Sequence, residues 1–225
     1  MRNKKKIFTI CSLVSLFCII MAIVDGVLMA DYFVKSAIKL VLFLGVPAIY
    51  AFFDKELSVK PLFKLNSNGL LLAVFLGVGV YAVILGGYLL LKDVFDFGNI
   101  TGALTKNIGV TGKNFIYVSL YISFVNSLLE EFFFRGFAFL TLKNVSSRKF
   151  SYVFSAGVFA LYHVAMMTGW FSLPVFIIVM AGLFAGGLIF NYLNEKSGTV
   201  YPSWLLHMCA NFAINTVGFM LFGII

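Results

Sequence analysis

Charge is scarce in this chain: Asp, Glu, Lys and Arg make up 12% of the 225 residues, and only nine residues are acidic. Soluble domains usually carry about 25% charged residues. With 61% hydrophobic residues and a mean hydropathy of +1.01, the chain holds more apolar surface than one soluble core of this size can enclose. The composition therefore excludes a soluble globular domain and predicts an integral membrane protein.

Cysteine is also scarce. Cys11, Cys18 and Cys209 all lie in apolar runs without metal-ligand spacing, which excludes a disulfide framework. No internal repeat or low-complexity tract marks a boundary, so residues 1–225 are expected to form a single membrane domain. The net charge of +8 follows from membrane topology and attraction to anionic lipid head groups, so the expected partner is the bilayer and not a nucleic acid.

Apolar residues gather in runs close to or above the ~20 residues that cross ~30 Å of hydrocarbon. Runs of this length must be helical, since lipid offers the backbone no hydrogen-bond partners. The predicted fold is all-α, a polytopic transmembrane helical bundle of seven to eight spans, because an eighth element can hide in the long fourth run or in 92–114. The seven runs are 7–30, 32–53, 69–91, 115–142, 150–168, 171–193 and 203–225.

Basic residues predict the orientation. If the Met1 end is cytoplasmic, eleven bases fall on the inside and three on the outside, a positive-inside bias that predicts a multi-pass protein of the cell membrane with a cytoplasmic N-terminus. The inside bases are Arg2, Lys4, Lys5, Lys6, Lys55, Lys60, Lys64, Lys143, Arg148, Lys149 and Lys196, and the outside ones are Lys92, Lys106 and Lys113. The remaining three, Lys35, Lys39 and Arg135, lie within apolar runs.

The fourth run carries the only pair of adjacent glutamates. Glu131 and Arg135 are four residues apart and share a helix face, so they are expected to form an ion pair. Glu130 points about 100° away, on a polar stripe with Asn126, and is expected to remain unneutralised. The alternative is that both acids pair with Arg135 and only hold helices together. One arginine does not neutralise two carboxylates, so a functional role is favoured.

Both histidines lie in later apolar runs. Phe159 and His163 are four residues apart and are expected to stack on one face, while His207, Asn211 and Asn215 form one polar ridge on the last run. Such residues also serve as interhelical hydrogen-bond partners, so this structural reading stays open for each helix taken alone.

Depth sets a condition on the last helix. Glu130 and His163 lie roughly 18–20 Å from the inside ends of their helices, whereas His207 lies only about 6 Å from Ser203. For these groups to meet, the last helix is expected to begin earlier, near Thr199, or tilt must absorb the difference.

A hydrolase is the chemistry that these groups support. A carboxylate is a general base for water, an imidazole can orient that water, and His and Asn N–H groups can stabilise an oxyanion. Glu and His also bind zinc, but no His-Glu-x-x-His helix is present, so a site without a metal or other cofactor is favoured and zinc is the alternative.

Three short motifs in order resemble a known family: Glu130-Glu131-x-x-x-Arg135, Phe159-x-x-x-His163 and His207-x-x-x-Asn211. Together, over about 80 residues, they resemble the CPBP intramembrane proteases, the CAAX-protease and bacteriocin-processing (Abi) family. Residues 115–225 would carry the protease core, and the first half adds only helices to the resemblance.

The resemblance implies a helical bundle that cuts prenylated or other peptides and proteins in or at the membrane. By it, Glu130 would activate water and His163 would position that water, while His207 and Asn211 would form the oxyanion hole. Glu131 and Arg135 would support the site, and we add Phe159 and Asn126 as supporting residues because of their spacing from His163 and Glu130.

Two other classes of function remain open from the residues. Intramembrane Glu and His side chains also serve transporters and proton relays, although no repeated halves are visible. A non-catalytic bacteriocin-immunity protein would keep the same fold without cleavage. Uptake or proton flux that disappears with Glu130→Gln, without any proteolysis, would favour the first, and protection that survives Glu130→Gln would favour the second.

Overall fold

The computed structural model describes residues 2–54 and 60–225, and every regular element in them is a helix. Lys55, one of the bases counted for orientation, lies outside the described residues. The elements are α1 (Arg2–Gly26), α2 (Tyr32–Leu40), η1 (Val41–Gly45), α3 (Val46–Phe53), η2 (Lys60–Phe63), α4 (Leu70–Leu91), α5 (Gly98–Ile108), α6 (Phe115–Tyr121), η3 (Ile122–Asn126), α7 (Ser127–Glu130), η4 (Glu131–Leu140), α8 (Thr141–Val145), α9 (Arg148–Met166), α10 (Leu173–Ser197) and α11 (Tyr201–Leu221).

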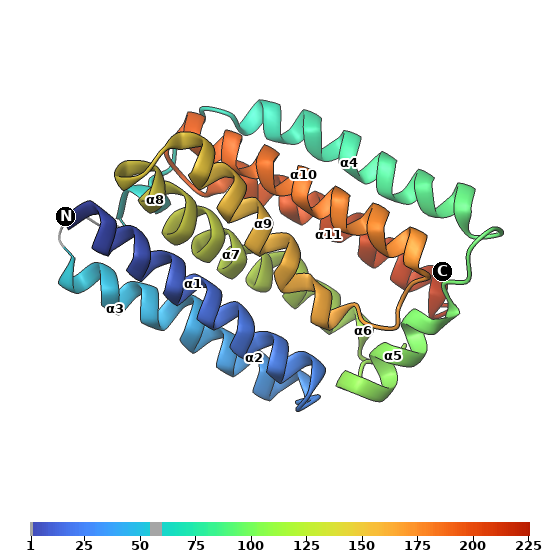
Figure 1. The fold of residues 1–225 in the computed structure, drawn as a ribbon. Coiled ribbons are helices and arrows are strands. Elements are labelled where there is room, and N and C mark those ends of the chain that lie inside the picture. Colours follow the sequence, from blue (N-terminus) through green and yellow to red (C-terminus); the bar gives the residue numbers. More distant parts are fainter. Residues whose placement is uncertain (1, 55–59) are drawn as a thin grey trace.

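The seven predicted runs correspond to seven long helices, because α2–η1–α3 and α6–η3–α7–η4–α8 are each continuous. In the described residues, six of the seven have the length and hydropathy of a membrane span, and α9 is the one below that threshold. Figure 1 shows α9 lying lengthwise in the bundle and the two termini at opposite ends, as an odd number of lengthwise passes requires. The predicted all-helical membrane bundle is confirmed, with six candidate spans among the described residues where seven to eight were predicted.

The eighth element is α5, in the connection 92–114. With 11 residues it is too short to cross the bilayer, and it packs at one end of the bundle (Figure 1). The prediction that an extra element hides in the fourth run is wrong, since this run is one unbroken helix over Phe115–Val145.

Local signals set the helix ends. The Asp31 carboxylate accepts from the N–H groups of Phe33 (2.9 Å) and Val34 (3.1 Å) and so caps the start of α2. The predicted first run, 7–30, instead ends as a helix at Gly26. Gly198 closes α10 with a left-handed φ of +73°, which glycine adopts without strain.

The fourth helix is unusual because two of its stretches, Ile122–Asn126 and Glu131–Leu140, are π-helical. π-helical turns distort the backbone and occur mostly near functional sites. Here neighbouring helices donate to its carbonyl groups: Trp204 Nε1 to Phe124 O (3.2 Å) and Ser155 Oγ to Phe134 O (2.8 Å). These donors compensate a distorted backbone in a setting without water.

Close approach of α4 and α11 depends on Gly77. A β-carbon added there would lie 2.7 Å from Cys209 Sγ and 3.1 Å from Cys209 Cβ. Two residues later, Gly79 has nothing within 4 Å of the same position. A small residue at an interhelical contact is what lets membrane helices pack closely.

The last helix begins at Tyr201 with Val200 as its N-cap, which is earlier than the predicted run 203–225 and close to Thr199, so the expected earlier start is confirmed. The depth difference is absorbed because the start of this helix is recessed into the bundle. The N–H of Val200 donates to the carbonyl of Leu62 (3.0 Å), and both side chains pack against Phe132 in the middle of the fourth helix.

The alignment of the fourth helix with α11 that results from this contact places His207 at the depth of Glu130. A β-carbon added to Gly136 would lie 3.8 Å from Val200 Cγ1. From that level, Glu130 lies six residues along one helix and His207 seven residues along its antiparallel neighbour, so rises of about 9–10 Å bring the two side chains to the same depth.

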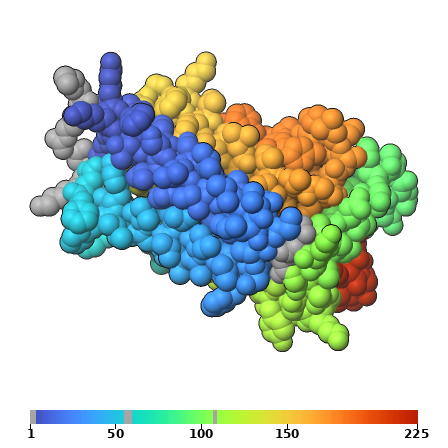
Figure 2. All heavy atoms as spheres, turned by 60° about the horizontal axis from the view of Figure 1, so that its bottom comes forward, coloured from blue at the N-terminus to red at the C-terminus, as the bar shows by residue number. Residues whose placement is uncertain are grey.

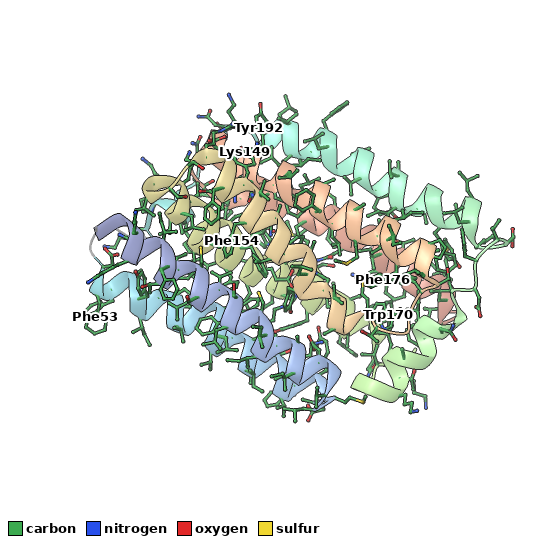
Figure 3. All side chains as sticks on the ribbon, in the orientation of Figure 1. Phe53, Lys149, Phe154, Trp170, Phe176 and Tyr192 are labelled. Atoms are coloured by element: carbon green, nitrogen blue, oxygen red, sulfur yellow. The ribbon has the colours of Figure 1, made fainter. Side chains whose placement is uncertain are left out.

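The outer surface of the bundle is apolar. Many large hydrophobic side chains are exposed, among them Phe8 and Phe33 on the two N-terminal helices and Phe53 at the end of α3. Figure 2 shows α1 and α2–α3 covering one face side by side, and Figure 3 shows Phe53 projecting outward. Such a surface fits contact with lipid tails.

Candidate active site

Glu130 lies inside the bundle, where only 2% of the residue is exposed. Its Oε1 accepts from Lys39 Nζ at 2.5 Å and from Asn126 Nδ2 at 3.0 Å. The expectation that Glu130 is unneutralised is therefore wrong. Arg135 is not its counterion, as predicted, but Lys39 on α2 takes that place, because helices far apart in sequence pack together at this level.

The other oxygen of Glu130 faces both histidines. Its Oε2 lies 3.9 Å from His163 Nε2 and 3.8 Å from His207 Nε2. These distances are longer than a hydrogen bond, so the three atoms surround a small space without closing on one another. α7, α9 and α11 each contribute one of the three side chains.

His163 is held by its own helix. Its Nδ1 lies 2.7 Å from the carbonyl of Phe159, and the ring meets Phe159 edge to face at 4.8 Å. The expected stacking on one face is confirmed. Because a carbonyl only accepts, Nδ1 carries the proton, and the Nε2 of the neutral ring presents a lone pair toward Glu130.

His207 is held by the second glutamate. Its Nδ1 lies 2.9 Å from Glu131 Oε1, and the same oxygen forms the expected ion pair with Arg135 Nη1 at 3.4 Å. Glu131 and Arg135 are both fully buried. The ring of Phe190 contacts both groups: it stacks against His207 at 5.3 Å between ring centres, and its centre lies 4.7 Å from the guanidinium carbon of Arg135.

The carboxamides on the last helix bind the fourth helix. Asn211 Nδ2 donates to the carbonyl of Ile122 (3.2 Å), and Asn215 Nδ2 donates to the carbonyl of Ser119 (3.2 Å) and to Ser123 Oγ (2.9 Å). These are the interhelical hydrogen bonds that the sequence analysis gave as the alternative to a catalytic role. An amide carries two N–H groups, so Asn211 still has a second donor, whereas Asn215 uses both of its N–H groups in these bonds.

The charges of the site balance. Two carboxylates, Glu130 and Glu131, face two permanent cations, Lys39 and Arg135, with all four residues at most 4% exposed. Burying charges in this way is tolerable only when they are paired. With neutral histidines the cluster carries no net charge.

Zinc does not fit this donor set well. In the part of the chain that the structure describes, no three His, Cys, Asp or Glu side chains are arranged to hold a metal ion. The Lys39 ammonium already supplies a positive charge at Glu130, and a dication beside it would be repelled.

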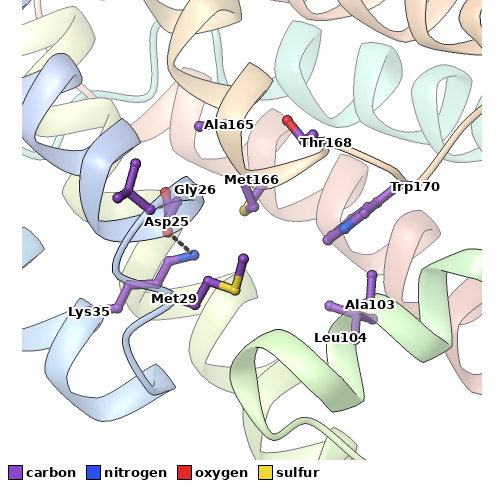
Figure 4. Close-up of a pocket in the computed structure, with 11 residues that line it drawn as sticks. Asp25, Gly26, Met29, Lys35, Ala103, Leu104, Ala165, Met166, Thr168 and Trp170 are labelled. Carbon is purple, nitrogen blue, oxygen red and sulfur yellow. Dashed lines mark ion pairs between the residues drawn. The ribbon is translucent and has the colours of Figure 1, made fainter.

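A cavity of about 270 Å³ opens toward one end of the bundle, between the α1–α2 turn, α5 and the end of α9 (Figure 4). Its polar wall is the ion pair between Asp25 and Lys35, 2.5 Å apart, and its apolar wall includes Met29, Leu104 and Met166. Lys35 lies one helical turn from the lysine bound to Glu130.

Sequence reasoning brought Glu130, Glu131, His163 and His207 to one place but missed Lys39 and Phe190. A lysine inside an apolar run was the available signal, since such a charge needs a buried partner. Nothing in the sequence distinguishes Phe190 from the other 26 phenylalanines of the chain.

Comparison with protein-family models gives one finding that covers this site. Residues 112–213 match the model described as "Type II CAAX prenyl endopeptidase Rce1-like". The match includes all three motifs and excludes α1 to α5. The comparison with curated proteins gives no match, and neither does the comparison with solved structures. The match agrees with the family suspected from the motifs, and residues 112–213 are similar to the Rce1-like type II CAAX prenyl endopeptidases, a family of membrane proteases.

Proposed function

We propose that this protein is an intramembrane endopeptidase of the glutamic type, in which Glu130 activates water without a metal ion. The observation that carries the proposal is the meeting of Glu130 Oε2 with the Nε2 atoms of His163 and His207 at 3.9 and 3.8 Å. Three helices within the family-matched segment supply these groups. We assign the reaction to residues 115–225.

In the proposed reaction, a water molecule sits between Glu130 and His163. It donates one hydrogen to Glu130 Oε2 and the other to the lone pair of His163 Nε2, which orients its oxygen toward the substrate carbonyl. Glu130 takes a proton as the oxygen attacks the carbonyl carbon. The same proton then passes to the leaving amide nitrogen as the C–N bond breaks, and Glu130 returns to its carboxylate form.

The oxyanion is proposed to be stabilised by His207 and Asn211. The Nδ1–H of His207 is committed to Glu131, so its Nε2 carries a hydrogen only when the ring is an imidazolium, a charge that Glu131 stabilises directly. Asn211 would use the N–H that does not bind Ile122. Arg135 and Phe159 would hold the partners of the two histidines in place.

The substrate class is proposed from the family. A peptide or protein that is itself held at the membrane, such as a prenylated CAAX sequence or a bacteriocin or pheromone precursor, can reach a site buried among helices. The protein is placed in the cell membrane with its N-terminus in the cytoplasm, because basic residues concentrate at that end of its helices.

Comparative proteomics of membrane peptides tests the proposal. Cells with wild-type protein and cells with Glu130→Gln should differ in a precursor that accumulates only with the variant. Purified wild-type protein should cleave an internally quenched peptide that ends in a farnesylated CAAX sequence, and Glu130→Gln and His163→Ala should not, although both remain folded in membranes. Cleavage at wild-type rates by both variants would refute the assignment, and insensitivity to chelators would support the metal-free form.

A further inference from the structure

Lys39 stands out because it adds a sixth charged or ionisable side chain to the site, and because it comes from outside the family-matched segment. It lies on α2, and its Nζ is 2.5 Å from Glu130 Oε1 and 2.6 Å from Asn126 Oδ1. Only 4% of the residue is exposed. A lysine that is fully committed to a proposed catalytic carboxylate requires an explanation.

The two oxygens of Glu130 have separate environments. Oε1 accepts from Lys39 and Asn126, whereas Oε2 faces His163 and His207 and has no hydrogen bond shorter than 3.5 Å to either ring. The terminal torsion of a glutamate is broad and roughly two-fold. Anchoring one oxygen therefore fixes the plane of the carboxylate and holds the other oxygen toward the histidines.

The anchor itself is rigid. The Lys39 ammonium lies 4.9 Å from the ring centre of Tyr162 and 5.5 Å from that of Phe43, where cation–π attraction favours it. Phe43 stacks on Phe133 of the fourth helix, with ring centres 4.0 Å apart and planes at 11°. Since Phe133 follows Glu130 by three residues, the lysine and the glutamate are fixed to one another through packing as well as charge.

We propose that Lys39 is a positioning residue of the peptidase site: it holds Glu130 Oε1 so that Oε2 alone serves as the base for water. The inference rests on the proposed function and adds α2 to the catalytic machinery. It also explains how a carboxylate flanked by a second carboxylate one residue later stays ionised inside the bundle.

Lys35 offers a matched control one turn away on the same helix. It forms a buried ion pair of the same length, 2.5 Å, but with Asp25 and not with a residue of the proposed site. Removing either lysine leaves one buried acid without its cation, so Lys35→Met and Lys39→Met should both lower the thermal stability. Only the second should change the chemistry of the folded enzyme.

The experiment measures kcat and KM of purified wild-type protein, Lys39→Met, Lys39→Arg and Lys35→Met with the quenched farnesylated CAAX peptide, at a temperature where each variant is folded. We expect kcat to fall about 100-fold in Lys39→Met, the size of loss that small displacements of catalytic groups cause, with KM within about two-fold. Lys39→Arg keeps the charge and should recover most of kcat. Lys35→Met should keep the wild-type kcat.

If Lys39→Met does not fold, Asn126→Ala tests the same anchor more weakly, since it removes the second donor to Oε1 and the oxygen that accepts from the Lys39 ammonium but keeps the ion pair. Its kcat should fall about ten-fold at unchanged KM. A wild-type or increased kcat in Lys39→Met, or in Asn126→Ala where that variant has to replace it, would overturn the inference while leaving the peptidase assignment intact. Wild-type protein that shows no cleavage dependent on Glu130 would overturn the proposed function itself.

Discussion

The ion pair between Arg135 and Glu131 allows a quantitative prediction. Both residues are fully buried, with 3.4 Å between Nη1 and Oε1, and the guanidinium lies 4.0 Å from the ring centre of Phe159. Replacing Arg135 with Met preserves much of the volume but leaves Glu131 without its cation. The site then loses one positive charge at a position where both partners are fully buried and the remaining carboxylate is poorly solvated.

Breaking one partner of a buried ion pair typically costs about 3–5 kcal/mol. For a chain of this size, 1 kcal/mol corresponds to roughly 2–4 °C in melting temperature, so Arg135→Met should melt about 6–20 °C below wild type. The double variant Arg135→Met/Glu131→Gln removes both charges and keeps a side chain that can accept from His207. We expect it to recover most of the loss.

Thermal unfolding in detergent, followed with a thiol-reactive dye, provides the measurement, because the free cysteines Cys11, Cys18 and Cys209 are partly buried in the helices and react fully only on unfolding. A single variant that melts like wild type would show that the pair contributes nothing. A double variant as unstable as the single one would show that packing, and not the unpaired charge, accounts for the loss. Either result contradicts the reasoning.

Three further predictions concern packing and the oxyanion site. Gly77→Ala should lower the melting temperature, because its methyl group meets α11. Gly79→Ala on the same helix should leave the stability unchanged or increase it by up to about 1 kcal/mol. Equal melting temperatures of the two variants would exclude the close contact. Asn211→Ala should lower kcat about 100-fold or more if the amide stabilises an oxyanion, while Asn215→Ala should affect only stability. An unchanged kcat in Asn211→Ala would assign Asn211 a purely interhelical role. Phe190→Leu should lower peptidase activity with a small stability loss, and wild-type turnover would show that stacking does not position the imidazole.

Much of the fold follows from the sequence because hydropathy acts locally. A continuous apolar run in lipid has to be a helix, and the seven predicted runs are the seven long helices of the structure. The ends were less predictable, since they depend on capping groups such as Asp31 and on recessed contacts such as that of Val200 with Leu62.

Within one helix, residue spacing was sufficient to predict side-chain contacts. The four-residue intervals of Glu131 with Arg135 and of Phe159 with His163 are fixed by helical geometry, and both contacts are present. Separation of Glu130 from Arg135 was predicted on the same basis, but the consequence drawn from it, a carboxylate without a counterion, was wrong because its partner comes from another helix.

Sequence alone thus determined that the protein is a membrane helical bundle, which residues share a helix face, and which motifs relate it to a protease family. Tertiary structure alone decided that Lys39 neutralises Glu130, that Phe190 contacts both Arg135 and His207, and that the recessed start of α11 brings His207 to the depth of Glu130. The reason is physical: periodicity along a helix is written in consecutive residues, whereas the depth and partner of each helix depend on packing between segments that are far apart in the chain.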